Sequence, residues 1–565
     1  MSDANPMLVP TRSDRSIVLL LYGLSALLVL WFVVDQVTWR HIHVDEFQQA
    51  ANAQLLVRFG LDSHATGVEP WLIGYGLLTR NLQSSIDVVL VGRAFFATLA
   101  LCSLIVLAEI QPFDTSRRGR AIATCALVGS LVFWRHAIEV RHDTFQLPAA
   151  VAAFWLITLA KEKRTTFLRA LVVGVVCSVS TANCLKAVVL FGPLLFVAGI
   201  AVRGRLATMA GLAIGASAGA LLTFAFVHAT GHSAQLWRTI DGLLTSQVAN
   251  NDNTDFFFVR FGPEPLLSDF FFSEPMWCFG LVVVMVDAFR AKTRSLTIPR
   301  ILFAPVLAGV LFLYVNPAPY AYNMLAVSPF FILAGLGGLS AIFVRAGTAR
   351  ELACLLVFVQ LMAFYRGATR DAYFNVDNTE QSRTIAAAEA LTGPNDSVLD
   401  GVGMVSTRPP ATRHWLLHSA LMRAYGSGRR ESFARVLEQS PPVVITNYRW
   451  AWLSGDVTEA LEAAYLQLSP DLWALSPASA TPAGTIRVNR AGRYRIEAAG
   501  SIGPVALGAL AGTHGAIVTL PKATLDYRID GASGLRLIWV GPVLDLLPDL
   551  PAQGPPILIP EGQPY

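Results

Sequence analysis

Several ionisable side chains lie where the chain leaves long apolar segments, and their types suit group-transfer chemistry. They form four groups: Asp45-Glu46; Glu139-Val140-Arg141-His142-Asp143; Glu69 with nearby His64; and Lys186. A carboxylate can take a proton from an acceptor hydroxyl. An arginine or lysine, with or without a divalent metal ion, can stabilise the charge on a departing phosphate. Together the four groups predict transfer of a chemical group from a phosphate to a hydroxyl.

Three of the groups also have a purely structural explanation. Carboxylates such as Asp45 and Glu46 are favoured at the N-terminus of a helix, where they interact with its dipole. The charges between Glu139 and Asp143 could pair with one another at a membrane face. Lys186 could extend its ammonium group to the interface, although an ionisable residue at a membrane helix is also a functional candidate. Function is favoured because all four groups fall on the same predicted side of a membrane.

The elements that position these groups are those of a polytopic membrane protein. Of the 565 residues, 54% are hydrophobic and 15% are charged, whereas a soluble protein has about 25% charged residues. The apolar runs predict eleven membrane helices, at residues 16–34, 87–108, 120–136, 145–160, 167–182, 184–202, 207–228, 275–290, 300–316, 322–344 and 350–366. The six cysteines show no spacing typical of a metal site or of a disulfide framework.

The positions of arginine and lysine predict the topology. Every even-numbered gap between the predicted spans is short and basic, as at Arg117 and Arg118 or at Arg203 and Arg205. This is the pattern of cytoplasmic loops, so the N-terminus is predicted inside and residues 367–565 outside. No small-residue cleavage site follows the first span, which therefore predicts an anchor rather than a signal peptide.

The chain divides into three predicted parts. Residues 1–366 form a transmembrane domain with outer loops at 35–86, 137–144 and 229–274. Residues 367–476 predict an α/β unit, and residues 477–565 a small β unit with a proline-rich tail.

Within these parts, several local elements are predicted from patterning. Apolar spacing from Asp45 to Gly60 favours a helix along the membrane surface, and Trp71–Leu78 a second one after Glu69-Pro70. The long loop from Gly231 to Glu274 could be a mobile lid. In the C-terminal part, short strands at 397–400 and 443–446 flank a helix at 410–438. Later strands are predicted at 485–489, 492–498, 516–520, 525–529 and 535–540.

The order of these motifs resembles the GT-C glycosyltransferases, in the branch of the lipid A aminoarabinose transferases and protein O-mannosyltransferases. That branch has an Asp, often Asp-Glu, in its first outer loop, matched here by Asp45-Glu46. The branch carries a Glu/Lys-Pro-Pro-like element later in that loop, then an apolar stretch and an arginine that opens the next span. Val68-Glu69-Pro70-Trp71 and Arg93 correspond to these here. Arg141-His142-Asp143 matches its second outer Asp, and the region from Tyr320-Ala321-Tyr322-Asn323 to Pro329 its tyrosine-containing turn. The resemblance covers roughly residues 16–345.

The resemblance implies an inverting glycosyltransferase with a polyprenyl-phosphate-linked sugar donor and a lipid, glycan or protein acceptor. It implies these site residues: Asp45 as base and Asp143 as second catalytic carboxylate; Arg58, Arg141 and Lys186 for the donor phosphate; Glu46, His142, Tyr320 and Tyr322 as accessory residues; and Glu69 with His232 for a divalent metal ion. The lysine that follows the glutamate in the family's Glu-Lys-Pro-Pro form is absent, so another cation must bind the phosphate. No organic cofactor is expected. We expect a bacterial inner membrane, with the C-terminal part periplasmic or extracellular.

Two other classes of function stay open. A transporter or flippase for a glycolipid would carry its charges near mid-membrane, often on broken helices, whereas here they cluster at one boundary. A non-enzymatic assembly or sensor protein would use the C-terminal part as a binding module. A nucleic-acid partner is not expected, because the basic residues are concentrated in the short cytoplasmic loops next to membrane lipids.

Overall fold

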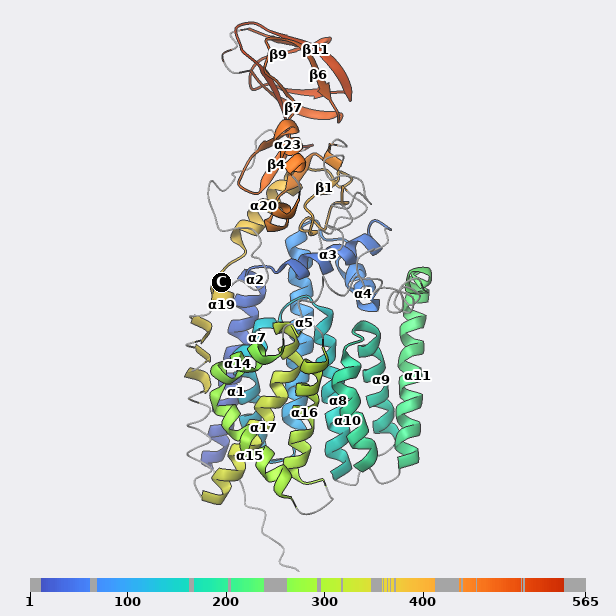
Figure 1. Cartoon of the computed structure of the whole chain (residues 1–565), viewed down its shortest axis with the longest axis vertical. Coiled ribbons are helices and arrows are strands. Elements are labelled where there is room, and N and C mark those ends of the chain that lie inside the picture. Colours follow the sequence, from blue (N-terminus) through green and yellow to red (C-terminus); the bar gives the residue numbers. More distant parts are fainter. Residues whose placement is uncertain are drawn as a thin grey trace, which may run out of the picture.

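The computed structural model of the chain describes residues 12–60, 69–161, 167–201, 205–237, 262–291, 296–316, 319–346, 358–411, 436–437 and 440–542, apart from positions 359, 363, 366, 370, 371, 454, 499, 501 and 502. A helical bundle forms one end of the molecule, and residues 372–542 form a domain stacked on the other end (Figure 1). Helices α3 and α4 lie between the two. We call the end of the bundle that carries this domain the domain side.

The bundle consists of long apolar helices and shorter helical segments between them. They are α1 (Arg12–Trp31), η1 (Phe32–Gln36), α2 (Val37–Trp39), α5 (Ser85–Glu109), α6 (Arg117–Val128), α7 (Leu131–Ala137), η2 (His142–Phe145), α8 (Gln146–Lys161), α9 (Phe167–Asn183), α10 (Ala187–Ala201), α11 (Arg205–Ala229), α14 (Glu264–Ser273), α15 (Pro275–Arg290), α16 (Ile298–Val315), η4 (Ala321–Asn323) and α17 (Met324–Ala346).

Within the described residues, six helical segments are long and apolar enough to cross a membrane. There are seven if α14 and α15, which are bent by 110° where they join, count as one span. Helices α9 and α10 are shorter apolar helices. The predicted polytopic membrane fold is therefore confirmed. The count of eleven stays a prediction, because the last predicted span, 350–366, lies largely outside the described residues.

The third predicted span, 120–136, is not one helix. It breaks between α6 and α7, where the buried Glu274 accepts a hydrogen bond from the Leu131 N–H at 3.0 Å. Gln360 donates both to Glu274 Oε2, at 2.6 Å, and to the Gly129 carbonyl, at 2.9 Å. A helix end buried in the bundle needs such partners. Hydropathy alone misses the break because the groups that satisfy it are distant in sequence.

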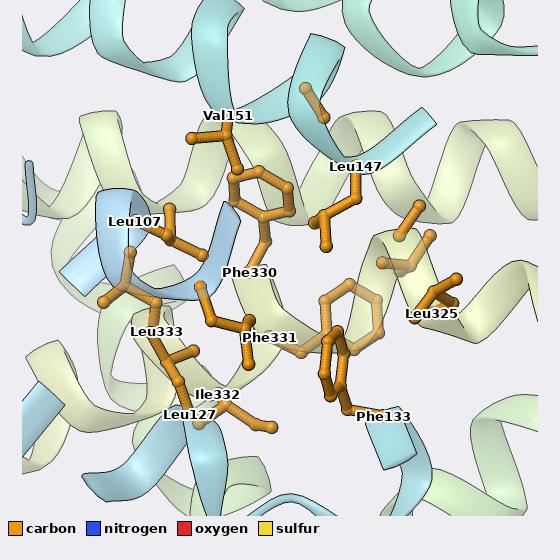
Figure 2. Close-up of a cluster of buried hydrophobic side chains, with 14 of the residues drawn as sticks. Leu107, Leu127, Phe133, Leu147, Val151, Leu325, Phe330, Phe331, Ile332 and Leu333 are labelled. Atoms are coloured by element: carbon orange, nitrogen blue, oxygen red, sulfur yellow. The ribbon is translucent and has the colours of Figure 1, made fainter. Parts of the chain in front are cut away.

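The bundle core is a continuous set of aliphatic and aromatic side chains. Figure 2 shows part of it, with residues from α5, α6, α7, α8 and α17 packed together: Leu107, Leu127, Phe133, Leu147, Val151, Leu325, Phe330, Phe331, Ile332 and Leu333. Helix α17 is buried along most of its length. It therefore acts as the centre around which the other helices are arranged.

Two short helices form a layer on the domain side. Helix α3 (Val44–Val57) and helix α4 (Pro70–Thr79) lie where surface helices were predicted at 45–60 and 71–78. Pro70 occupies the first turn of α4, where a missing N–H costs nothing. His64 and most of the predicted lid, including residues 238–261, lie outside the described residues.

The domain contains three four-stranded sheets. The first has the order β1-β2-β4-β3, and the others β10-β7-β12-β5 and β6-β11-β8-β9. Strands β1 and β2 are parallel, and the remaining pairs are antiparallel. Their bounds are β1 (Val398–Leu399), β2 (Val443–Ile445), β3 (Tyr465–Gln467), β4 (Leu472–Leu475), β5 (Ala478–Ser479), β6 (Ala483–Val488), β7 (Gly492–Glu497), β8 (Val505–Leu507), β9 (Leu510–Gly512), β10 (Ile517–Leu520), β11 (Ala523–Ile529) and β12 (Leu535–Trp539).

The domain also holds short helices, and its sheets share a buried core. The helices are α19 (Ala372–Asn375), α20 (Thr379–Ala390), η5 (Tyr448–Trp452) and α23 (Gly455–Ala464). Side chains of the second and third sheets, such as Tyr494 and Tyr527, pack in one cluster with Val444 of the first. Residues 412–435 and 438–439 of the predicted helix 410–438, and the proline-rich tail, lie outside the described residues.

The start of the domain pairs with the chain that leads into α3. The His41 N–H donates to the Val376 carbonyl, and the Asn378 N–H to the Trp39 carbonyl, both at 2.8 Å. The buried Gln381 amide bonds both backbone groups of Ile42, at 2.7 and 2.8 Å. These bonds fix the domain directly above the segment that carries the first predicted catalytic group.

Candidate active site

Most of the predicted site residues meet on the domain side of the bundle. The N-terminus of α3, the turn 138–141, η2 and the start of α10 come together there with η4 beneath them. Five carboxylates converge, and each has a cationic or imidazole partner within 4 Å. They are Asp45, Glu46, Glu69, Glu139 and Asp143.

Glu46 has a structural position. Its side chain is fully buried and forms two 2.8 Å hydrogen bonds with Arg93 of α5. It also accepts from the His43 N–H at 2.9 Å, and so closes a capping box at the start of α3. Arg93 in turn donates to the carbonyls of Arg40 and His41 at 2.8 Å. The pair therefore fixes the direction in which α3 begins, and with it the position of Asp45.

Asp45 lies beside Arg141. Its Oδ2 is 2.6 Å from Arg141 Nη2, and the Asp45 side chain keeps 23% of its surface exposed. The Arg141 guanidinium stacks on Tyr322, with Cζ 3.6 Å from the ring centroid. Burial raises the pKa of Asp45, but Arg141, with His43, outweighs it, so the pKa lies below its ordinary value. Asp45 is thus an ionised, partly accessible carboxylate, as a proton acceptor must be.

Glu139 belongs to the predicted charged group 139–143, but the sequence assigns it no role. It lies between Arg40, His136 and Arg141. Its carboxylate is 3.1 Å from His136 Nδ1, 3.5 Å from Arg40 Nη2 and 3.6 Å from Arg141 Nη1. Burial raises the pKa of Glu139, yet these three neighbours together hold it well below its ordinary range. Arg141 therefore contacts both Glu139 and Asp45, and the contact with Glu139 fixes the position of the guanidinium.

Asp143 lies beside the predicted phosphate-binding lysine. Lys186 Nζ is 3.7 Å from Asp143 Oδ1, and Gln146 donates to the same oxygen at 3.0 Å. Arg141 Nε is 3.8 Å from Asp143 Oδ2. Arg141 therefore bridges Asp45 and Asp143. Lys186, with 43% of its side chain exposed, presents a positive charge to the surroundings.

The geometry around His142 is suited to a metal ion. Ligand atoms of His142, Asp143 and Cys184 lie within 4.8 Å of one another. His142 Nδ1 is buried and, among the described residues, has no hydrogen-bond partner; Glu69 Oε1 is 3.6 Å away. Nitrogen, oxygen and sulfur donors are those of protein zinc sites. Burial raises the pKa of Glu69 although His142 opposes it.

The predicted metal pair is therefore placed differently by the structure. His142, rather than His232, lies next to Glu69, whose Oε2 also accepts from Trp71 Nε1 at 2.5 Å. His232 Nε2 lies 3.4 Å from the Leu56 carbonyl, near the far end of α3. The sequence does not predict Cys184 as a metal ligand. The signal for this role is its position two residues before Lys186.

Arg58 also does not join the cluster. It follows the last residue of α3, so about 20 Å of helix separates it from Asp45 at the other end. Its guanidinium donates to the Leu82 carbonyl at 3.0 Å. Tyr320, by contrast, stacks on Tyr322 at 5.4 Å between ring centroids. Of the predicted phosphate-binding residues, the structure brings together Arg141 and Lys186.

A large apolar cavity opens beside this cluster. It has a volume of about 1290 Å³ and is lined by α9, α10 and α11, with Glu69, His142 and Lys186 at its polar end. Along α10 it extends from Lys186 to Ile200, a rise of about 21 Å. Its walls are otherwise mostly aliphatic and aromatic, including Phe191, Leu195 and Met209. The cavity is thus long, apolar and charged at one end.

Comparison with known proteins finds similar folds among solved structures. No protein-family model and no curated protein matches the sequence. Among solved structures, the chain is similar to ArnT from Cupriavidus metallidurans in the apo state, with a TM-score of 0.55 and 14% identity, over 82% of this chain and 98% of that one.

Two oligosaccharyltransferase structures are also similar. One is AglB from Archaeoglobus fulgidus in complex with an inhibitory peptide and a dolichol-phosphate, with a TM-score of 0.45 and 12% identity, over 91% of this chain and 76% of that one. The other is the Archaeoglobus fulgidus oligosaccharyltransferase in complex with Zn and sulfate, with a TM-score of 0.44 and 14% identity, over 80% and 72%. The likeness to ArnT shows a shared fold and confirms the predicted GT-C architecture.

Proposed function

We propose that the protein is a glycosyltransferase that moves a sugar from a polyprenyl-phosphate donor to a hydroxyl of a cell-envelope acceptor. The observation that carries the proposal is a chain of charged side chains, Asp45, Arg141, Asp143 and Lys186, that leads to a long apolar cavity, where Lys186 is part of the lining. The shared fold with ArnT supports the same assignment.

The cavity suits the lipid part of such a donor. A prenyl chain is apolar, and removing apolar surface from water contributes about 25 cal/mol of favourable free energy per Å². The cavity would bind the chain inside the membrane, along α9, α10 and α11. The donor phosphate would then lie at the polar end, where Lys186 and Arg141 supply positive charge. Charge-assisted contacts of this kind bind phosphate well.

The reaction follows from the positions of the carboxylates. Asp45 accepts the proton of the acceptor hydroxyl while that oxygen attacks the anomeric carbon of the sugar. The bond between this carbon and the phosphate oxygen breaks, and the phosphate leaves with the electron pair. Arg141 and Lys186 stabilise the charge that develops on it. Attack from the side opposite the leaving group inverts the anomeric configuration.

A divalent metal ion would fit beside the phosphate. His142, Asp143 and Cys184 would hold it, with Glu69 next to His142. Such an ion would act as a Lewis acid on the phosphate.

The orientation follows from the loop charges. The basic gaps of the sequence support a domain side outside the cytoplasm, so donor and acceptor would meet on the extracytoplasmic face, as at a bacterial inner membrane. The acceptor would be a lipid, a glycan or a protein. A transporter or flippase fits less well, because the charged cluster lies at one end of the bundle.

Replacement of Asp45 tests the proposal. In cells that lack the chain, mass analysis of envelope glycolipids and glycoproteins should reveal a sugar-sized loss, which the wild-type chain restores. Asp45→Asn keeps the size of the side chain but removes the carboxylate that accepts the proton, so transfer should fall by about 100-fold or more. Asp87→Asn, at an exposed position in the first turn of α5, is the matched control and should restore transfer within about twofold.

The outcomes separate two failures. Full transfer by a membrane-inserted Asp45→Asn protein would remove Asp45 from its role as the base. An envelope that is unchanged when the whole chain is absent would overturn the glycosyltransferase proposal itself.

A further inference from the structure

The C-terminal domain packs two loops toward α3, in a buried cluster that includes Val44 and Phe47 of that helix. Strands β1 and β2 are parallel, with Val398 paired to Val443 and Leu399 to Val444. Their carboxyl ends therefore lie at the same edge of the sheet, where ligands bind in open α/β sheets. The loop after β1 begins at Asp400, and the loop after β2 contains η5, which includes Arg449.

Hydrogen bonds hold these loops in one conformation. The buried Asp400 carboxylate accepts from the N–H groups of Val402, Gly403 and Val405 at 2.6 to 3.1 Å. Asn447 donates to the Asp400 carbonyl at 2.8 Å and accepts from the Arg449 N–H at 3.0 Å. Asn447 thus ties the two loops together and fixes the backbone from which Arg449 extends.

The same loops pack against the helix that carries Asp45. Val402, Met404 and Val405 of the first loop share a buried cluster with Val44 and Phe47 of α3. Tyr448 of the second loop packs against this cluster, and Arg449 Nε donates to its hydroxyl at 3.1 Å. Arg449 itself is only 7% exposed. It is therefore a buried arginine next to Tyr448, which packs against the cluster that contains Val44, the neighbour of Asp45.

Charged groups reach Asp45 from every element around it. His43 precedes α3, with Nδ1 at 3.9 Å, and Arg141 lies at 2.6 Å in the turn below. Glu139 adds negative charge from the same turn. The C-terminal domain contributes Arg449. Burial and Glu139 raise the pKa of Asp45, whereas Arg141, His43 and Arg449 lower it.

We propose that Arg449 is a positioning residue for Asp45, so that the catalytic site is composite and incomplete without the C-terminal domain. The proposal rests on the glycosyltransferase function above. Arg141 is shared with Glu139, Asp143 and Tyr322, and it is needed by the departing phosphate. Arg449 belongs to the C-terminal domain, whereas the proposed donor phosphate would lie beside Arg141 and Lys186 of the bundle. It keeps Asp45 ionised and oriented while Arg141 turns to the donor, and the acceptor enters between η5 and the bundle.

The test compares Arg449→Gln with Arg449→Lys in membranes of cells that lack the wild-type chain. Conversion of the envelope product found by mass analysis is followed from about pH 4 to about pH 8. Removing the positive charge raises the pKa of Asp45, so the acid limb of the rate should move to higher pH. At the acidic end, Arg449→Gln should lose about tenfold more activity than at the alkaline end. Arg449→Lys should keep the limb near that of wild type.

The controls distinguish positioning from folding. Arg528→Gln, at a position 79% exposed on β11, should leave the pH profile unchanged. Tyr448→Phe removes the hydroxyl that accepts from Arg449 and should shift the limb in the same direction by a smaller amount, which provides a test if Arg449→Gln does not fold. An unshifted acid limb in both Arg449→Gln and Tyr448→Phe would overturn the inference.

Wild type and Asp45→Asn in the same membranes separate this failure from that of the function. Transfer by wild type but not by Asp45→Asn supports the proposed function whatever Arg449 does. Absence of transfer by wild type overturns the function and the inference together.

Discussion

At the scale of the residue, Cys184 provides a test of the proposed metal site. Its thiol lies within 4.8 Å of ligand atoms of His142 and Asp143. Thiolate is a strong ligand for zinc, so purified wild-type protein incubated with Zn²⁺ and then desalted should retain about one ion per chain. Cys184→Ser should bind zinc at least about tenfold more weakly, since even removal of groups outside the ligand set costs that much. Metal content measured by mass spectrometry gives the result without an activity assay.

Cys177→Ser is the matched control for this change. Cys177 is also buried and lines the same cavity, but its thiol lies near the Ala149 carbonyl rather than in the cluster. The variant should retain as much zinc as wild type. Equal zinc retention by Cys184→Ser, or none by wild type, would remove the metal site from this model of the reaction.

The sequence predicted most members of this cluster but not their pairing. Asp45, Arg141, Asp143 and Lys186 stand out in the sequence because ionisable groups beside apolar segments are functional candidates. Adjacent carboxylates, however, look alike in a sequence. The structure separates them, because Glu46 is enclosed by Arg93 while Asp45 stays accessible. Pairing across 47 residues depends on helix packing, which periodicity does not encode.

At the scale of the element, α9 and α11 pack closely enough to form one wall of the cavity. Gly211, Gly215 and Gly219 of α11 recur every four residues on the face toward α9. A Cβ at Gly215 would lie 2.1 Å from the Leu171 carbonyl oxygen. Small residues at this spacing let membrane helices approach closely. The other faces of α11 are left for lipid and for the cavity.

A tryptophan in the cavity should therefore exclude the prenyl chain. Ala220 is one of the residues that line the cavity, whereas Ala225 on the same helix is exposed and lies outside that lining. Ala220→Trp should weaken binding of a polyprenyl phosphate by about tenfold, or about 1.4 kcal/mol, because the indole occupies the space of the lipid. Ala225→Trp, the matched control, should bind it as wild type does. Native mass spectrometry in detergent measures both, and equal affinities would exclude the cavity as the lipid site.

The helices could be predicted better than their interruptions. Apolar runs identified α5, α11 and α16, because length and hydropathy are local properties. The break between α6 and α7 could not be found in this way, since its partner Glu274 is more than a hundred residues away.

At the scale of the whole molecule, the question is whether the C-terminal domain is a separate module or part of the site. It is held to the bundle by more than the chain that connects them. Ser85 at the start of α5 bonds Glu389 at 2.7 Å through its hydroxyl, and the segment from Val376 to Gln381 pairs with the approach to α3. The domain edge at η5 is thereby held against the buried cluster that contains Val44, next to Asp45. A substitution that removes one of these contacts should therefore lower the activity of the site, although no residue of the site itself is replaced.

Gln381→Ala makes that change. Its amide, 1% exposed, satisfies both backbone groups of Ile42, and leaving them unpaired costs about 1–3 kcal/mol. Faster amide hydrogen exchange is expected at residues 38–47, together with a fall in transfer of about tenfold. Exchange in α17 should not change, because the bundle core is distant. Gln467→Ala, at an exposed amide that bonds the Pro470 carbonyl, should alter neither measurement. Unchanged exchange at 38–47 in Gln381→Ala would mean that the domain is held independently of this contact, and that the composite site does not depend on it.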